Sequence, residues 1–494
     1  MPQPDFSAVS TDATPQAPEA PKTGKDLPQI IQGGMGIAVS GWQLARAISQ
    51  AGQLGVVSGT ALDNVMVRRL ADGDAGGHVR RALQNFPFPA LSEPVIQKYF
   101  QPEGRLPEES YPALRLRSNL KPFETDLLIV LGSFVEVWLA KEGHTGQVGI
   151  NLLTKIQTPT LPALYGAMLA GVDAVLMGAG IPRDIPAALE QFSQGKPASI
   201  RLEGTDFRLE FDPAQTLGVE LTLPKPLFIP IISAHSLAQM LVRSCPNGIA
   251  GFVVEGPTAG GHNAPARGKT SDERGQPIYG EKDKVDLSVM RNLGLPFWLA
   301  GGTGSPEAFK AALAEGAHGI QVGTLFAYSQ DSGMTPELKA GALNKVQQEN
   351  LEVFTDSRLS PTGFPFKAVV LEETLAFEEV EAHRQRVCDL GYLRQTYTTE
   401  QGKIGFRCAA EPVDAYVSKG GKVEDTEGRK CLCNALLSTV GLAQVRKNGD
   451  IEPPLLTAGD DLAHLQPFIQ RYGTVYKAVD VLEYLLGEAL PAKG

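Results

Sequence analysis

The sequence lacks several features that would define other classes of protein. No apolar run among its 494 residues is long enough to cross a bilayer, which takes about 20 residues, so we expect no membrane span. The N-terminus has neither a basic start nor an apolar core, which excludes a secretory signal and leaves a cytoplasmic location as the expectation. Excess positive charge is also missing. The formal net charge of −10 argues against a nucleic acid or an anionic membrane as partner.

Cysteine is scarce, with five residues in the whole chain, and Cys245 stands alone as an expected buried apolar residue. The other four lie close together in the sequence, at Cys388, Cys408, Cys431 and Cys433. Disulfides are rare in the cytoplasm, so these thiols are candidate ligands of a zinc ion or an iron–sulfur cluster. Their spacing fits no standard pattern of either site. Unlinked thiols in a compact segment are therefore an equally open interpretation.

Composition and periodicity divide the chain into three parts. Residues 1–27 are rich in Pro, Ala, Ser and Thr and predict a disordered tail. Residues 28–335 alternate short apolar runs with helix-like stretches, a rhythm that is typical of parallel strands joined by helices. Residues 336–494 lose this alternation and predict a C-terminal extension that is mostly helical or irregular.

The most informative stretch is residues 251–324. Three apolar runs there, which begin at Gly251, Pro296 and Gly319, each end in glycines or small polar residues. Such runs are typical of buried parallel strands with loops at their carboxyl ends. Residues 301–304 and 323–324 would then follow the last two strands of a barrel, where a phosphate often binds. Glycine lets backbone N–H groups approach an anion closely.

In four motifs the chain resembles the nitronate monooxygenase family, formerly called 2-nitropropane dioxygenases. The motifs are, in order, PQIIQGGMG, VEGPTAGGHNAP, LAGGTG and IQVGTLF. The resemblance covers roughly residues 28–330. Members of the family are FMN-dependent barrel enzymes, and the related FMN-dependent enoyl-ACP reductases share the Gly-Gly-His loop. The resemblance thus implies a flavin-dependent oxidoreductase that binds FMN, a small-molecule substrate and O₂.

With this family as a guide, the fold expected is an α/β protein, a (β/α)₈ barrel. Eight strand-like runs fit it, at residues 29–32, 54–58, 148–153, 174–178, 227–233, 251–255, 297–300 and 319–322. Residues 59–125 break the rhythm and predict a helical insertion after the second strand. Alternating polarity around Gly204 predicts a hairpin at residues 199–211.

The resemblance implies which residues hold the FMN. Its phosphate would lie against Gly301, Gly302, Gly323 and Thr324, with Gly260 and Gly261 at the border of the pocket. The flavin ring would lie along Gly33, Gly34 and Met35, and Asn151 matches a family asparagine that hydrogen-bonds the flavin. Members often place a basic residue near the pyrimidine edge, for which Lys155 and Lys225 are candidates here. Gln32 either points into the ring pocket or closes a polar gap in the barrel.

His262 follows two glycines at a strand end, where barrels place catalytic groups. A neutral imidazole whose pKa lies near the working pH is suited to remove the acidic α-proton of a nitroalkane, so we expect a general base. The alternative is a loop histidine bonded to the backbone. The family commonly has a basic residue directly after this histidine, whereas Asn263 follows it here, which leaves the substrate open.

Three functions are therefore compatible with the sequence. The leading one is oxidation of nitronates or nitroalkanes by O₂, with His262 as base. The second is an NAD(P)H-dependent flavin reductase of enoyl thioesters, in which Arg267, Lys269 and Arg274 of the polar loop 263–286 would bind an anionic carrier or nucleotide. The third is a non-redox barrel that acts on a phosphorylated substrate. The oligomeric state is left open.

Overall fold

The computed structural model describes residues 23–121, 125–460 and 462–487. Eight parallel strands form one sheet in the order β1-β11-β10-β8-β7-β4-β3-β2. A parallel bridge between Ile31 and Leu54 joins β1 to β2 and closes the ring, so the predicted (β/α)₈ barrel is confirmed. The strands are β1 (Ile30–Gln32), β2 (Gly55–Ser58), β3 (Val148–Leu153), β4 (Ala174–Gly178), β7 (Leu227–Ile232), β8 (Phe252–Glu255), β10 (Phe297–Ala300) and β11 (Gly319–Val322).

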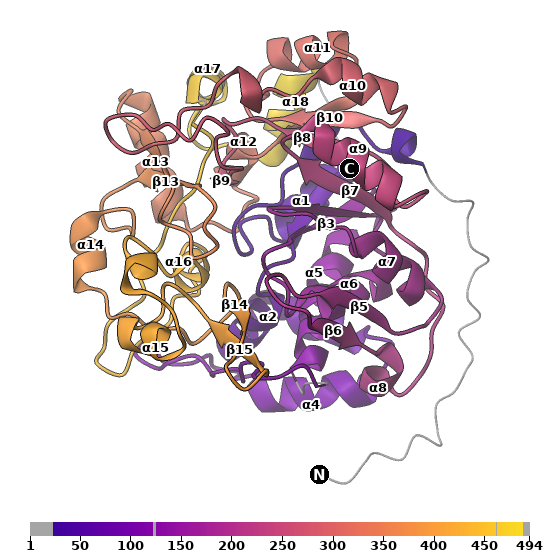
Figure 1. Ribbon diagram of the computed structural model, residues 1–494, viewed down its shortest axis with the longest axis vertical. Coiled ribbons are helices and arrows are strands. Elements are labelled where there is room, and N and C mark those ends of the chain that lie inside the picture. The colour runs from indigo at the N-terminus through magenta and orange to yellow at the C-terminus, as the bar shows by residue number, and fades with distance from the viewer. Residues whose placement is uncertain (1–22, 122–124, 461, 488–494) are drawn as a thin grey trace.

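Helices surround the strands (Figure 1). The helices of the barrel are α1 (Trp42–Gln50), α5 (Asp126–Lys141), α6 (Thr160–Leu169), α7 (Ile185–Ser193), α9 (His235–Ser244), α10 (Leu287–Asn292), α11 (Pro306–Ala314) and α12 (Thr324–Ala327). The predicted insertion contains α2 (Leu62–Ala71), the short 3₁₀ helix η2 (Ala75–Gly77), α3 (His78–Gln84) and α4 (Pro89–Tyr99). The predicted hairpin is present as the antiparallel pair β5 (Ala198–Arg201) and β6 (Arg208–Phe211), and α8 (Pro213–Leu217) follows it.

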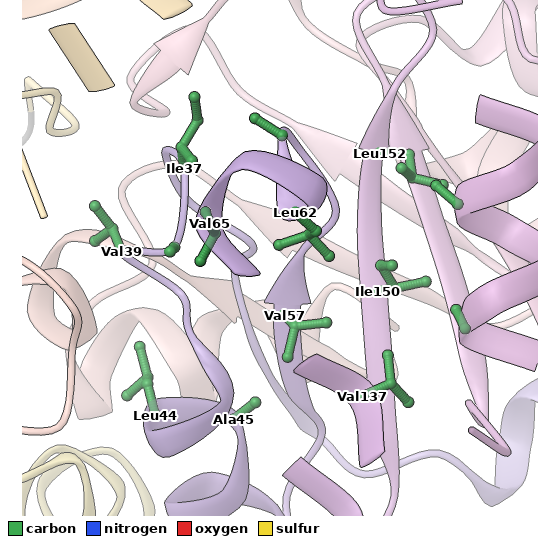
Figure 2. Packing of buried hydrophobic residues seen from close by; sticks show 14 of the residues in the cluster. Ile37, Val39, Leu44, Ala45, Val57, Leu62, Val65, Val137, Ile150 and Leu152 are labelled. Atoms are coloured by element: carbon green, nitrogen blue, oxygen red, sulfur yellow. The ribbon is translucent and has the colours of Figure 1, made fainter. Parts of the chain in front are cut away.

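The barrel strands are apolar throughout because both of their faces are buried. Side chains that point into the barrel form one cluster, which includes Val56, Leu176 and Trp298. Side chains that point outward pack beneath the helices. Figure 2 shows this outer layer, with Val57 of β2 and Ile150 of β3 close to residues of α2 and α5. Because both the inward and the outward side chains of each strand are buried, the strands need the continuous apolar runs that the sequence displays.

The chain is ordered a few residues earlier than predicted. Residues 23–27 were expected to belong to a disordered tail, yet η1 (Gly24–Asp26) lies against the barrel and Leu27 is buried. The indole Nε1 of Trp298 donates a hydrogen bond of 2.9 Å to the Pro28 carbonyl just beyond it. The first residues of the predicted tail, 1–22, lie outside the described residues.

The C-terminal extension is more regular than expected. It contains two antiparallel strand pairs, and β13 of the first pair also binds β9 (Gly261–His262) of the barrel. Its elements are α13 (Pro336–Gln347), β12 (Glu352–Asp356), β13 (Phe366–Val370), α14 (Glu378–His383), β14 (Gln395–Thr398), β15 (Ile404–Arg407), α15 (Val413–Ser418), η4 (Val423–Thr426), α16 (Leu432–Ser438), η5 (Leu462–His464), α17 (Leu465–Tyr472) and α18 (Ala478–Leu486). The part from α13 to α16 lies on one side of the barrel, whereas α17 and α18 lie near α11 (Figure 1). Within the described ranges, no helix combines the length and the apolar character that crossing a bilayer requires.

We expect Gly166→Ala to destabilise the fold, because α6 packs closely on α5 at this position. A Cβ atom on Gly166 would lie 2.2 Å from the Val130 carbonyl oxygen. Overpacking of this kind costs about 1–3 kcal/mol, so thermal unfolding should begin several degrees earlier. The matched control is Gly280→Ala, at a position with a φ of −131° where nothing lies within 4 Å of the added Cβ. Equal melting temperatures for Gly166→Ala and the wild type would contradict the prediction.

Candidate active site

A cavity opens at the carboxyl ends of the barrel strands, and all eight strands contribute to its wall or to the loop directly after it. Every predicted cofactor residue and His262 line this cavity. They are Gly33, Gly34, Met35, Asn151, Gly260, Gly261, His262, Gly301, Gly302, Gly323 and Thr324. The structure therefore brings together residues that are up to about 290 positions apart in the sequence, as the topology of a barrel requires.

One end of the cavity is built from backbone. Gly301 and Gly302 both have a left-handed conformation, with φ of +86° and +70°, and a Cβ on Gly301 would lie 2.9 Å from the Ala259 nitrogen. The amides of Gly302, Thr303 and Thr324 donate to no acceptor among the described residues. Helix α11 begins directly after this loop, capped by the Ser305 hydroxyl, which accepts from the Ala308 amide at 3.1 Å. This is the kind of cradle that binds a phosphate.

Two polar side chains of the cavity wall need a partner. Asn151 Nδ2 donates to the Gly34 carbonyl at 3.0 Å, and the missing side chain of Gly34 makes this approach possible. The oxygens Asn151 Oδ1 and Gln321 Oε1 are buried and accept no hydrogen bond from any described residue. An unsatisfied buried acceptor costs about 1–3 kcal/mol. FMN has a ring N–H and ribityl hydroxyls to offer, so both the backbone cradle and these side chains fit this cofactor.

Side-chain contacts show where Gln32 and the two candidate lysines, Lys155 and Lys225, are engaged. Gln32 closes a polar gap in the barrel: its Oε1 accepts from the Val56 amide at 2.9 Å and its Nε2 donates to the Ser40 hydroxyl at 2.8 Å. The two lysines considered for the flavin edge lie elsewhere, because Lys155 pairs with Glu203 and Lys225 with Glu190. Among the described residues that line the cavity there is no lysine and no arginine.

His262 lies on β9 and is held from the extension. Its Nε2 is 2.7 Å from the Ser360 hydroxyl, and its ring packs edge-on against Phe366 with the ring centroids 4.9 Å apart. In the pairing of β9 with β13, Phe366 stands directly opposite His262. Burial lowers the pKa of His262 to about 4, so the imidazole is neutral at physiological pH. The contact to a side-chain hydroxyl differs from the backbone bond that was the alternative.

Several residues of the wall were not anticipated from the sequence, and most of them come from the extension. Thr457 accepts a hydrogen bond of 2.8 Å from the Gly261 amide, and the Gly459 amide donates to the Thr324 hydroxyl at 2.9 Å. His464 Nε2 is 2.8 Å from the Gly302 carbonyl, beside the phosphate cradle. Glu255 also faces the cavity, at the end of β8. Its place directly after an apolar run was the one sequence signal that marked any of these residues.

The four cysteines of the extension also come together, although not as predicted. They line one small cavity beneath the active-site wall, and each of them is a free thiol. Contact with Cys408 lowers the pKa of Cys388, whereas burial raises the pKa of Cys431 and of Cys433. In the part of the chain that the structure describes, no three His, Cys, Asp or Glu side chains are arranged to hold a metal ion. The predicted zinc or iron–sulfur site therefore gains no support.

Fold and cavity together define a class: a barrel enzyme whose carboxyl-end loops suit a flavin. The comparison with family models agrees, since residues 213–360 match the model described as nitronate monooxygenase. The match confirms the resemblance that the motifs indicated, over less than half of the chain, and the chain is a flavin-dependent oxidoreductase. The comparison with curated proteins finds no match.

Three solved structures align with most of the chain. FabK from Thermotoga maritima shares 16% identity, covers 93% of this chain and 91% of its own, and has a TM-score of 0.46. A nitroalkane oxidase from Streptomyces ansochromogenes shares 15% identity over 94% of this chain and 96% of its own, with a TM-score of 0.45. The enoyl reductase domain of MlnA from Bacillus amyloliquefaciens shares 12% identity over 93% of each chain, with a TM-score of 0.46. Likenesses of this strength carry no argument about function.

We expect Asn151→Ala to weaken FMN binding. The substitution removes the orphaned acceptor and the amide that positions the Gly34 carbonyl. Loss of one hydrogen bond is worth about 0.5–1.5 kcal/mol, so the dissociation constant should rise roughly two- to twelvefold. The measurement is quenching of FMN fluorescence on titration with apoprotein. The control is Asn292→Ala, at an exposed position at the end of α10. An unchanged affinity in Asn151→Ala would contradict a flavin contact at this residue.

We also expect His262 to remain neutral far below the ordinary range for histidine, about pH 6.5. Its burial lowers the pKa to about 4, so the ring should gain a proton only as the pH falls toward 4. Ring chemical shifts of selectively labelled protein, titrated from pH 8 to 4.5, would follow this ionisation. The spectrum of His262→Asn identifies which signal belongs to His262. A midpoint near 6.5 for that signal would show that the ring is solvated and not enclosed.

Proposed function

We propose that this chain is an NAD(P)H-dependent flavin reductase of enoyl thioesters, the second of the functions that the sequence left open. The observation that carries the proposal is the neutral wall of the cavity: the described residues that line it include neither lysine nor arginine. A nitronate is an anion, and burying an anion without a partner is unfavourable. The C=C and C=O groups of an enoyl thioester carry no charge and need no such partner.

The extension gives the cavity an apolar side, which supports a substrate with a hydrocarbon chain. Leu393, Leu432, Leu436, Leu465 and Phe366 all line the cavity and all belong to residues 336–494. Burial of apolar surface contributes about 25 cal/mol per Å². A chain of several methylene groups would therefore gain affinity along this wall, whereas a small nitroalkane would leave most of it unused.

The state of His262 supports the same choice. An imidazole with a pKa of about 4 is a weak base for removing the α-proton of a nitroalkane. A neutral imidazole can instead hydrogen-bond the carbonyl oxygen of a thioester. The Ser360 hydroxyl, 2.7 Å from Nε2, and the Phe366 ring hold its orientation.

FMN, when bound, would supply hydride transfer between NAD(P)H and the substrate. The chain's own residues would bind and position the cofactor and exclude water. The cradle at Gly301, Gly302 and Thr324 would hold the phosphate, Asn151 and Gln321 would position the polar groups of the flavin, and the extension would keep water away from the substrate. The loop 263–286 is less free to bind a nucleotide than its charge suggested, since Arg274 pairs with Glu352 and the Arg267 guanidinium is bonded to carbonyls of its neighbours.

Oxidation of nitronates by O₂ is the second candidate, and the observation in its favour is the match of residues 213–360 to the nitronate monooxygenase model. In that reaction His262 would be the base, as first expected. The cytoplasmic location and the oligomeric state stay predictions without a test, and the third function, a non-redox barrel, is set aside with the assignment to the flavin oxidoreductases.

An experiment can distinguish the enoyl-thioester reductase from the nitronate oxidase, because different compounds would reduce and reoxidise the flavin in the two enzymes. We expect NADPH to bleach the flavin of FMN-loaded protein without O₂, and a trans-2-octenoyl thioester of N-acetylcysteamine to restore the oxidised spectrum. The crotonyl thioester, which has a shorter chain, should restore it less efficiently. Propyl-2-nitronate should leave the oxidised flavin unchanged. Bleaching by the nitronate alone, with no reoxidation by either thioester, would reject the reductase in favour of nitronate oxidation.

A further inference from the structure

Glu255 occupies a place in the active site to which no role has been given. It is the last residue of β8, and it is the only carboxylic acid among the described residues that line the large cavity. The same side chain also lines a second, smaller cavity beneath the loop 263–286, together with Asn263, Arg267, Tyr279 and Asp283. Glu255 therefore lies in the wall that the two cavities share.

The carboxyl group of Glu255 is half-buried, faces the cavity and has no partner: among the described residues it forms no hydrogen bond and no ion pair. Burial raises the pKa of Glu255 to about 8, and the charge of Lys367 opposes this rise in part. Lys367 itself is occupied, since its Nζ donates to Asp460 Oδ2 at 2.6 Å and to Thr355 Oγ1 at 2.7 Å. At neutral pH the carboxyl group of Glu255 is therefore protonated, and its O–H group donates no hydrogen bond to any described residue.

Other groups in the cavity are less suited to give a proton. His262 is neutral at pH 7, because its pKa is about 4. The Tyr392 hydroxyl already donates to Asp63, the Ser58 hydroxyl to the Gly36 carbonyl at 2.6 Å and the Thr303 hydroxyl to the Gln321 carbonyl at 3.0 Å. A hydroxyl also has a far higher pKa than a carboxylic acid. Glu255 is the group in this wall that combines a proton, a suitable acidity and freedom from other partners.

We propose that Glu255 is the general acid of the reductase, a catalytic residue that protonates the substrate. The proposal rests on the function proposed above. FMN, when bound and reduced by NAD(P)H, would supply a hydride to the β-carbon, and the electron pair of the C=C bond would form a new C–H bond at the α-carbon with the proton of Glu255. The O–H bond of Glu255 breaks in this step. The carboxylate then takes a proton from water in the smaller cavity, so the acid is restored for the next turnover.

The first test uses Glu255→Gln, which keeps the shape of the side chain and removes the acidic proton. The matched control is Glu281→Gln, on the neighbouring loop, where the side chain is 84% exposed. Each holoenzyme is reduced with dithionite without O₂ and mixed with the trans-2-octenoyl thioester. A general acid contributes about 10²–10⁴ in rate. We therefore expect flavin reoxidation to slow at least a hundredfold in Glu255→Gln and to stay within twofold of the wild type in Glu281→Gln.

The second test is the dependence on pH, where the sign follows from which form is active. The protonated acid is present below its pKa of about 8, so the wild-type rate of reoxidation should fall as the pH rises through 8. This limb should be missing in Glu255→Gln. It should move to higher pH in Lys367→Met, because removing the cation raises the pKa of Glu255 further. The other titratable or charged groups near this site, Tyr279, Asp283, Arg267 and Asp460, are not substituted in either variant, and Lys367→Met also removes the ion pair of Asp460, whose negative charge raises the pKa of Glu255 in the same direction.

The third test needs no turnover. The infrared band of a protonated carboxylic acid should disappear from the wild type as the pH rises through 8, and this change should be missing in Glu255→Gln. A structural role for Glu255 would reduce flavin content or stability and leave the alkaline limb in place. That result, or rapid reoxidation in Glu255→Gln, would overturn the role of Glu255 alone. No reoxidation of the wild type by thioesters would instead reject the reductase, and the proposed acid with it.

Discussion

The catalytic end of the barrel depends on the antiparallel pairing of β13 with β9. This short ladder joins segments about a hundred residues apart and places Phe366 opposite His262 and Lys367 opposite Gly261. Without it, the Gly-Gly-His loop would face solvent, as loops at the carboxyl ends of barrel strands commonly do. With it, the loop becomes an edge strand of a three-stranded sheet whose middle strand is β13, and the extension becomes one wall of the active site. The extension is therefore part of the site and not an appended domain.

The same enclosure sets the acidities in the cavity. Burial disfavours the charged form of every group, so it lowers the pKa of His262 and raises the pKa of Glu255, and both groups are neutral at pH 7. Lys367, a buried cation next to them, is 1% exposed and is balanced by Asp460. The environment thus gives the two titratable groups different roles. The neutral imidazole of His262 has one N–H donor and one acceptor nitrogen, whereas the protonated carboxyl of Glu255 has an acidic O–H. Pairs of groups with opposite shifts commonly mark the acid and base positions of a site.

The sequence was sufficient for what local patterns encode. The apolar runs of β8, β10 and β11 and the glycines after them predicted the barrel and the loops that line its cavity, because strand periodicity and glycine conformation are properties of short segments. That these glycines hold FMN stays a prediction. It was not sufficient for Ser360, Thr457 or His464, since their role arises from long-range packing and no periodicity marks them. The four cysteines show the limit of spacing alone. Their convergence around one cavity is real, yet closeness in space does not by itself arrange thiols around an ion.

The departure at Asn263 connects the sequence to the choice of substrate. A basic residue is common at this position in the family that the chain resembles. Asn263 is instead 2% exposed, and its Nδ2 donates to the Ala259 carbonyl at 3.0 Å while its amide donates to the Pro365 carbonyl at 2.9 Å. The side chain of Asn263 thus forms a hydrogen bond within the histidine loop, and its backbone amide joins this loop to the extension. A lysine or arginine would have to leave this buried place or carry an unpaired charge into it. Closing the loop with an amide therefore fixes the strand that carries His262 and adds no charge beside it.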